Sequence, residues 1–224
     1  MPVTDPAHLY KKPFKKGVNY RPTRHISPLY KFPLYLRIPA WADGADLLAD
    51  GQRFSALNPG SIFKLEREWS GETRLLLNLP MKTELARGYH KSVTVLRGPL
   101  VYALKMGEDW RQVNADKPGH ELPHGDWEVY PTTPWNYGIK VKEETLSKDV
   151  VFENRPIGEN PFSPEGAPVT AHVQGRRLPD WTVQNGSAGD TPASPVESDQ
   201  PLEDLTLIPY GSTNLRVTEF PALL

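Results

Sequence analysis

Proline constrains the fold of this chain more than any other residue type, because 24 of the 224 residues are proline. That share is about twice the usual one. Proline lacks a backbone N–H and fixes φ, so it interrupts helices and is excluded from the middle of sheets. No long proline-free amphipathic segment occurs in the chain. The distribution of proline therefore excludes a helical bundle and long parallel βαβ units, and it favours short strands joined by turns.

The segments between the prolines alternate apolar and polar residues, which is typical of half-buried strands. Leu34, Leu36 and Ile38 share one face of the first such segment. Turn signals such as Asp50-Gly51 separate one segment from the next. The predicted strands comprise residues 34–38, 46–49, 61–68, 73–79, 92–96, 100–104, 126–130, 136–141, 169–173, 205–209 and 214–220. This spacing predicts an all-β fold, an antiparallel β-sandwich of the jelly-roll type with long proline-rich loops.

The predicted domain organisation is a leader followed by one large domain. Residues 1–42 carry eight basic side chains and one acidic side chain, and the early part of this region shows no apolar periodicity. Residues 1–31 are therefore expected to be a basic, poorly ordered leader, and residues 32–224 to be the β-sandwich domain. Long excursions rich in proline, glycine and polar residues are expected at 106–125, 154–168 and 182–203.

The absence of cysteine excludes several kinds of chemistry. There is no disulfide framework, no cysteine nucleophile and no metal centre bound by thiolates. No apolar stretch approaches the roughly 18 residues of a transmembrane helix, and the first residues lack the apolar core of a signal peptide. Glycine-rich phosphate-binding motifs are also missing. The sequence predicts no cofactor and neither a nucleic acid nor a membrane as a partner, and it leaves the localisation open.

One short motif resembles a zinc-binding pattern. His120-Glu121-Leu122-Pro123-His124 has the spacing H-E-x-x-H. Zinc proteases need a helix at this motif, because the helix places both histidines on one face. Pro123 lies inside the motif and removes a backbone donor, so a helix through it is unfavourable. We therefore predict a loop and no metal site, and the scattered carboxylates identify no catalytic residue.

Aromatic residues gather in one part of the sequence. The candidates are Trp110, Trp127, Tyr130, Trp135 and Tyr137. The acidic residues Asp126 and Glu128 are interleaved with them, and aromatic rings beside carboxylates suit the C–H faces and hydroxyl groups of sugars. These five residues are therefore candidates for carbohydrate contacts. The same residues could instead pack a loop onto the sandwich or onto another domain. Both interpretations remain open from the sequence.

Several ordered segments together resemble a known family. They are residues 32–41 (FPLYLRIPAW), 58–60, 67–69, 79–81, 97–103, 178–181 and 207–216. In this order they are similar to the β-sandwich portion of β-L-arabinofuranosidase-type glycoside hydrolases, glycoside hydrolase family 127 (GH127) and its relatives. The resemblance covers residues 32–221, and residues 1–31 depart from the family pattern.

The resemblance implies that this chain is not itself an enzyme. In that family the chemistry belongs to an N-terminal (α/α)6 barrel, which supplies a cysteine nucleophile on a cysteine-rich zinc site together with a glutamate. This chain has no cysteine, so the resemblance implies only the C-terminal, non-catalytic portion, and no catalytic residue is transferred. Either the chain is a fragment or a partner chain supplies the barrel.

Two functions are considered, the first from the resemblance and the second from the aromatic cluster. The first is an accessory domain that braces the catalytic barrel or mediates association, with that barrel or a second copy as its partner. The alternative is an autonomous carbohydrate-binding module that contacts arabinose-containing glycans through surface tryptophans.

Overall fold

The computed structural model describes residues 26–120 and 122–224, whose regular elements are almost all strands. The strands are β1 (Ile26–Arg37), β2 (Ala45–Ala49), β3 (Gln52–Leu57), β4 (Ile62–Gly71), β5 (Leu75–Asn78), β6 (Thr83–Arg87), β7 (Val93–Arg97), β8 (Leu100–Leu104), β9 (Glu108–Val113), β10 (Asp126–Pro131), β11 (Tyr137–Ile139), β12 (Val151–Asn154), β13 (Val169–Arg177), β14 (Val183–Gln184), β15 (Ser187–Ala188) and β16 (Leu202–Pro209). The strands pair in antiparallel fashion, which confirms the predicted all-β antiparallel fold.

The helical elements in the described part of the chain are short. They are the α-helix α1 (Leu146–Asp149) and the 3-10 helices η2 (Tyr89–Lys91), η3 (Glu143–Thr145) and η4 (Tyr210–Ser212). Within residues 26–120 and 122–224, no helix has the length and apolar character needed to cross a membrane.

The described residues form two compact units. The N-terminal unit contains residues 26–83 and the turn Arg97–Pro99, and the C-terminal unit contains Glu84–Leu96 and Leu100–Leu224. Each unit has its own cluster of buried apolar side chains. The sequence was interpreted as one domain from residue 32 onward. Alternation shows which side of a strand is buried, but it does not show which strands share a core, so it cannot separate two units.

The N-terminal unit consists of the sheet β1-β4 and the sheet β3-β2-β5. The alternation predicted for its strands is present, because the apolar residues at every second position of β2 are buried. Its core contains Ile38, Ala42, Ala45, Leu47, Ala49, Leu57, Leu65 and Trp69. Trp69 stacks on Phe32 with ring centroids 5.2 Å apart. Its indole N–H also donates to the backbone oxygen of Phe32 at 2.8 Å, so β1 and β4 are joined by side chains as well as by their ladder.

A tight turn between β7 and β8 belongs to the N-terminal unit. Gly98 in this turn has φ +56°, and its N–H donates to the backbone oxygen of Lys82 at 3.2 Å. A Cβ atom at Gly98 would lie 2.6 Å from the Cγ atom of Met81. Two independent reasons therefore favour glycine at this position: its positive φ and the close approach of the Met81 side chain.

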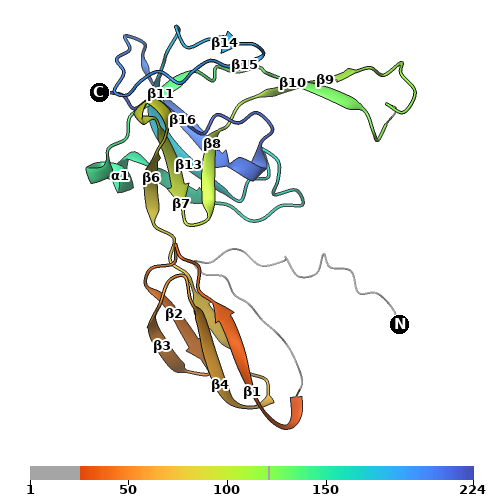
Figure 1. Cartoon of the computed structure of the whole chain (residues 1–224), viewed down its shortest axis with the longest axis vertical. Coiled ribbons are helices and arrows are strands. Elements are labelled where there is room, and N and C mark those ends of the chain that lie inside the picture. The colour runs from red at the N-terminus through yellow and green to blue at the C-terminus, as the bar shows by residue number, and fades with distance from the viewer. Residues whose placement is uncertain (1–25, 121) are drawn as a thin grey trace. The chain divides into compact units, whose positions relative to one another are not determined.

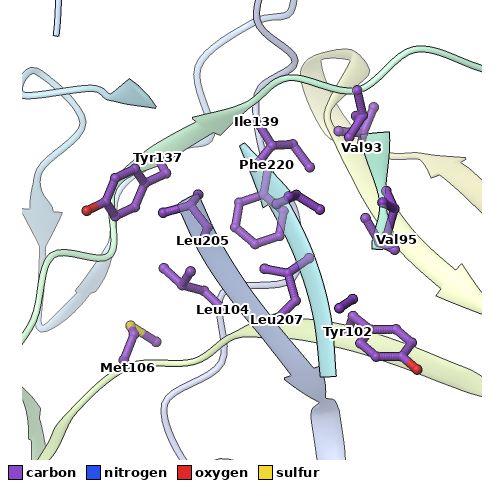
Figure 2. Packing of buried hydrophobic residues seen from close by; sticks show 14 of the residues in the cluster. Val93, Val95, Tyr102, Leu104, Met106, Tyr137, Ile139, Leu205, Leu207 and Phe220 are labelled. Carbon is purple, nitrogen blue, oxygen red and sulfur yellow. The ribbon is translucent and has the colours of Figure 1, made fainter. Parts of the chain in front are cut away.

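The C-terminal unit is built on a seven-stranded sheet in the order β11-β13-β16-β8-β7-β6, with β12 also paired to β13. Its buried cluster draws apolar side chains from most of these strands. Figure 2 shows the ring of Phe220 among Ile139, Leu205 and Leu207. Phe220 and Leu207 are both fully buried, so this cluster forms the centre of the unit.

The structure differs from the predicted leader and excursions. β1 begins at Ile26, so residues 26–31 belong to a strand instead of a leader, and residues 1–25 lie outside the described residues. The predicted excursion at 106–125 contains β9, and the one at 182–203 contains β14 and β15. Both faces of β9 are partly exposed and carry polar residues, so the segment lacks the apolar alternation of a half-buried strand and has the composition of a loop.

The strand predicted at residues 214–220 is wrong. Only Phe220 pairs here, through an isolated bridge with Val93 in which each backbone N–H donates to the other residue's oxygen at 2.8–2.9 Å. The remainder of the segment forms no ladder. The backbone N–H of Leu104 donates to the backbone oxygen of Val217 at 2.9 Å, and the Glu108 side chain accepts from the start of the segment. The strand propensity of a segment does not show whether a sheet edge is free to pair with that segment.

Candidate functional site

Three of the five predicted carbohydrate-contact residues lie on the hairpin formed by β9 and β10. Trp110 is on β9, and Trp127 and Tyr130 are on β10. Within the described residues these two strands form a separate two-stranded ribbon, which extends away from the larger sheet of the same unit (Figure 1). An isolated two-stranded hairpin is marginally stable in water. Contacts at its base must therefore hold this one in place.

Trp110 and Trp127 lie on the same face of the hairpin. In the ladder Trp110 is opposite Val129 and Trp127 is opposite Gln112, so the two indoles are diagonal neighbours. Their ring centroids are 6.2 Å apart and their planes are inclined by 70°, an edge-to-face arrangement. The two side chains are 47% and 44% exposed. Because the planes are steeply inclined, a sugar ring can stack on either indole, but a straight glycan cannot stack on both.

Tyr130 lies on the opposite face, which is charged and internally paired. The guanidinium of Arg111 lies over the Tyr130 ring, 4.5 Å from its centroid, and pairs with Asp109 at 2.7 Å. The hydrogen bond from the Tyr130 hydroxyl to Glu128, 2.6 Å long, is the main reason that the pKa of Tyr130 is raised. The hydrogen bond to Asp109 likewise raises the pKa of Arg111. Tyr130 is thus covered by a cation and separated from the two tryptophans.

Glu108 anchors the base of the hairpin to the segment 213–215. Its Oε1 atom accepts hydrogen bonds from the backbone N–H of Asn214 at 2.9 Å and of Leu215 at 3.3 Å. The Thr213 hydroxyl donates to the same oxygen at 3.1 Å, and the Trp110 indole N–H donates to Oε2 at 3.0 Å. Partial burial by itself raises the pKa of the carboxyl group, but the hydrogen bonds from 213–215 outweigh it, so the pKa of Glu108 lies below 4.5. The sequence did not single out this structural role.

The other two predicted contact residues lie elsewhere. Trp135 packs edge-to-face against Trp181 at 5.1 Å, and the buried Trp181 donates its indole N–H to the backbone oxygen of Gly189. Tyr137 is 5% exposed and belongs to the core of the C-terminal unit (Figure 2). Its hydroxyl donates to Glu203 at 3.0 Å, and burial together with this bond raises the pKa of Tyr137 to about 12. The structure therefore does not bring these two residues together with the tryptophan pair of the hairpin.

The zinc-like motif lies in the connection between β9 and β10. As predicted, the described residues of the motif form no helix there, and Glu121 lies outside the described residues. His120 contacts Asp126, with 2.8 Å between Nδ1 and Oδ2, and the Asn114 amide donates to the same oxygen at 3.0 Å. The bond from Asn114 is the largest cause of the lowered pKa of Asp126. In the part of the chain that the structure describes, no three His, Asp or Glu side chains are grouped closely enough to hold a metal ion.

The structure also shows an open groove of about 700 Å³ along β4 in the N-terminal unit. Two ion pairs border it, Asp50–Arg67 at 3.2 Å and Lys64–Glu66 at 2.6 Å. The Lys64–Glu66 hydrogen bond raises the pKa of the lysine and lowers that of the glutamate. The sequence analysis did not identify this groove. Its signal in the sequence is the pair of opposite charges, Lys64 and Glu66, at alternate positions of β4.

Residues 13–81 match the sequence model of a family described as beta-L-arabinofuranosidase, GH127 middle domain. The family resemblance is thereby confirmed for this segment. The described part of the GH127 middle-domain segment contains β1 to β5, and the hairpin with its tryptophans lies outside it. The match begins at residue 13, so the expectation that all of residues 1–31 depart from the family pattern is wrong.

Solved structures show a similar fold. A glycoside hydrolase is similar to this chain with a TM-score of 0.50 and 22% sequence identity, over 87% of this chain and 28% of its own length. A GH127 β-L-arabinofuranosidase from Geobacillus stearothermophilus T6 has a TM-score of 0.46 and 20% identity over 86% and 26% of the two chains. A GH127 β-arabinofuranosidase has a TM-score of 0.44 and 14% identity over 87% and 28%. The chain thus spans less than a third of each of these proteins, and no curated protein matches its sequence.

Proposed function

We propose that this chain is the non-catalytic accessory β-sandwich part of an arabinofuranosidase-like glycoside hydrolase, and that it braces a separate catalytic domain. The match of residues 13–81 to the GH127 middle domain is the observation that carries this proposal. The family resemblance assigns the chemistry to a helical barrel with a cysteine nucleophile, whereas this chain contains no cysteine. No residue of this chain is therefore assigned a catalytic role.

The tryptophan face of the β9–β10 hairpin supports association with another domain. Trp110 and Trp127 together expose a large aromatic surface on a ribbon that Glu108 anchors at its base. Exposed apolar patches of this kind mark interaction sites, and tryptophan is enriched among the residues that dominate binding energy. We assign the contact with the catalytic domain to this face of the hairpin.

The test is a binding titration between the purified chain and the separately produced catalytic domain of a GH127 β-L-arabinofuranosidase. The double variant Trp110→Ala/Trp127→Ala is expected to raise Kd by at least ~30-fold, because a dominant interface residue contributes about 2 kcal/mol or more. Phe162→Ala is the matched control, since Phe162 is 76% exposed and lies outside the hairpin. Absence of association, or an unchanged Kd in the double variant, would refute the proposal.

The second candidate function is a carbohydrate-binding module that uses the same two tryptophans. The exposure of both indoles favours it, because each ring can stack on one sugar. Titration with L-arabinofuranosyl oligosaccharides, followed by tryptophan fluorescence, distinguishes the two functions. A saturable change that Trp110→Ala/Trp127→Ala abolishes, without binding to the catalytic domain, supports the module. A scaffold gives no saturable change with the sugars.

A further inference from the structure

Among the strands that the structure describes, β4 has one edge without a partner strand. It is ten residues long and pairs with β1 on one side, and no described strand pairs with its other side. The backbone groups along such an edge form a template for another strand. The open groove in the N-terminal unit is lined by residues 63–67 of β4 and by Ala49, Asp50, Gln52 and Phe54 of the β2–β3 hairpin, so open space lies beside β4.

The hydrogen bonds of β1 show which residues of β4 face the free edge. The backbone N–H of Ile38, the residue after β1, donates to the backbone oxygen of Ser61 at 2.8 Å. Backbone groups of successive residues point to opposite sides of a strand, so the even-numbered residues of β1 direct their N–H and C=O groups toward β4. Pro33 lies opposite Glu66. Because Pro33 is odd-numbered, it makes no backbone hydrogen bond to β4, so the missing N–H of proline costs nothing there. It follows that Lys64 and Glu66 direct their N–H and C=O groups away from β1, toward the free edge.

The charges on the exposed face of β4 favour one pairing with a second copy. An antiparallel pair with its two-fold axis at Leu65 places Lys64 of each copy opposite Glu66 of the other. An axis moved to Lys64 would oppose two lysines, and an axis moved to Glu66 would oppose two glutamates. Opposite charges directly across a ladder stabilise it, and like charges destabilise it. Only the axis at Leu65 is complementary at both positions.

We infer that two copies of this chain associate through the free edges of β4, antiparallel about Leu65, with Lys64 of each copy paired to Glu66 of the other. The two β1-β4 sheets then form one continuous four-stranded sheet. In this register residues 62–68 of the two copies overlap, and the pairs formed by Lys64 and Glu66 exchange both backbone hydrogen bonds. The contact is isologous, so it closes as a dimer and does not propagate. This inference does not depend on the proposed function.

The test is a charge exchange, measured by sedimentation and by size-exclusion chromatography with light scattering on the full chain up to about 1 mM. Lys64→Glu alone and Glu66→Lys alone are each expected to raise the dimer Kd by at least ~tenfold, because two symmetric attractions become repulsions. The double variant Lys64→Glu/Glu66→Lys restores both pairs and is expected to return Kd to within about threefold of the original value. The double variant also restores the Lys64–Glu66 pair within each chain. A mixture of the Lys64→Glu chain with the Glu66→Lys chain restores opposite charges only between chains, so association of this mixture separates the pairing from any loss of folding in the single variants.

Arg87→Glu is the matched control. It breaks the exposed ion pair between Arg87 and Glu143 (3.1 Å) in the C-terminal unit and is expected to leave the dimer Kd unchanged. Hydrogen exchange provides a second measurement, because the amides of Lys64 and Glu66 become protected only as concentration rises. A monomer at all concentrations, failure of the double variant to restore association, or protection independent of concentration would each overturn the inference.

Discussion

Replacement of Glu108 tests whether one carboxylate holds the β9–β10 hairpin on the C-terminal unit. Glu108→Ala removes the acceptor for the backbone N–H groups of Asn214 and Leu215 and for the hydroxyl of Thr213. Thr213 is buried and Leu215 is partly buried, so water replaces these contacts poorly. Asn214 is exposed, and water can replace its bond.

The expected loss follows from these contacts. A buried polar group left without a partner costs about 1–3 kcal/mol, and an exposed one costs far less. The Thr213 hydroxyl can also donate to the backbone oxygen of Leu215 at 2.9 Å, so the shielded group that loses its acceptor is the N–H of Leu215. Glu108→Ala is therefore expected to lower the free energy of unfolding by about 1–3 kcal/mol. Glu108→Gln keeps an acceptor but loses the charge, so its expected loss is smaller, about 1–2 kcal/mol. Glu128→Ala, on the same hairpin, removes only a bond from an exposed tyrosine hydroxyl and should cost less than about 0.5 kcal/mol.

The assay is urea unfolding followed by far-UV circular dichroism and tryptophan fluorescence. Because the folded pKa of Glu108 lies below 4.5, its contribution is present at neutral pH and is lost as pH falls through that folded pKa. The difference between the original chain and Glu108→Gln should therefore shrink in that acidic range. An unfolding free energy for Glu108→Ala equal to that of Glu128→Ala would refute the reasoning.

Four further substitutions test the core of the C-terminal unit and two turns. The pKa of Tyr137 is raised from 10.0 to about 12, so its contribution to stability is lost as pH rises through this range. The thermal midpoint of the original chain should therefore fall between pH 10 and pH 12, and Tyr137→Phe should not show this fall. Gly98 and Gly51 both have positive φ, but only Gly98 has a close neighbour. In urea unfolding, Gly98→Ala should lower the free energy of unfolding by about 2–4 kcal/mol and Gly51→Ala by about 1–2 kcal/mol. Equal losses would contradict the steric argument. Leu207→Ala should cost about 2–5 kcal/mol, because this side chain is fully buried, and a loss below 1 kcal/mol would contradict its place in the core.

The strands with clear alternation were predictable, and the association of strands was not. The alternation in β2 and the apolar run of β8 identified these strands because their own residues show the burial. β9 was missed because four of its six residues are polar and occur on both of its faces, and because it belongs to a ribbon outside the main sheets. Segment 214–220 was assigned to a strand because its residues favour extended backbone, yet Glu108 occupies backbone donors at its start.

The candidate site shows the same division. The sequence places Trp110 and Trp127 in one aromatic cluster, and the structure brings their rings together because β9 and β10 form a hairpin. The same clustering grouped them with Tyr137, which lies in the core. The sequence could not indicate that Glu108 lies against Asn214, because the two residues are 106 positions apart.

The sequence by itself determined the all-β class of this protein, the absence of thiol chemistry and the family resemblance, because proline content, alternation, cysteine count and ordered motifs are local properties of the chain. The tertiary structure alone decided that two cores form, that no other described strand pairs with the second edge of β4, and that two indoles stay exposed while Tyr137 is buried. These outcomes depend on which distant segments cover each strand face and edge, and burial is a property of such contacts and not of any residue alone.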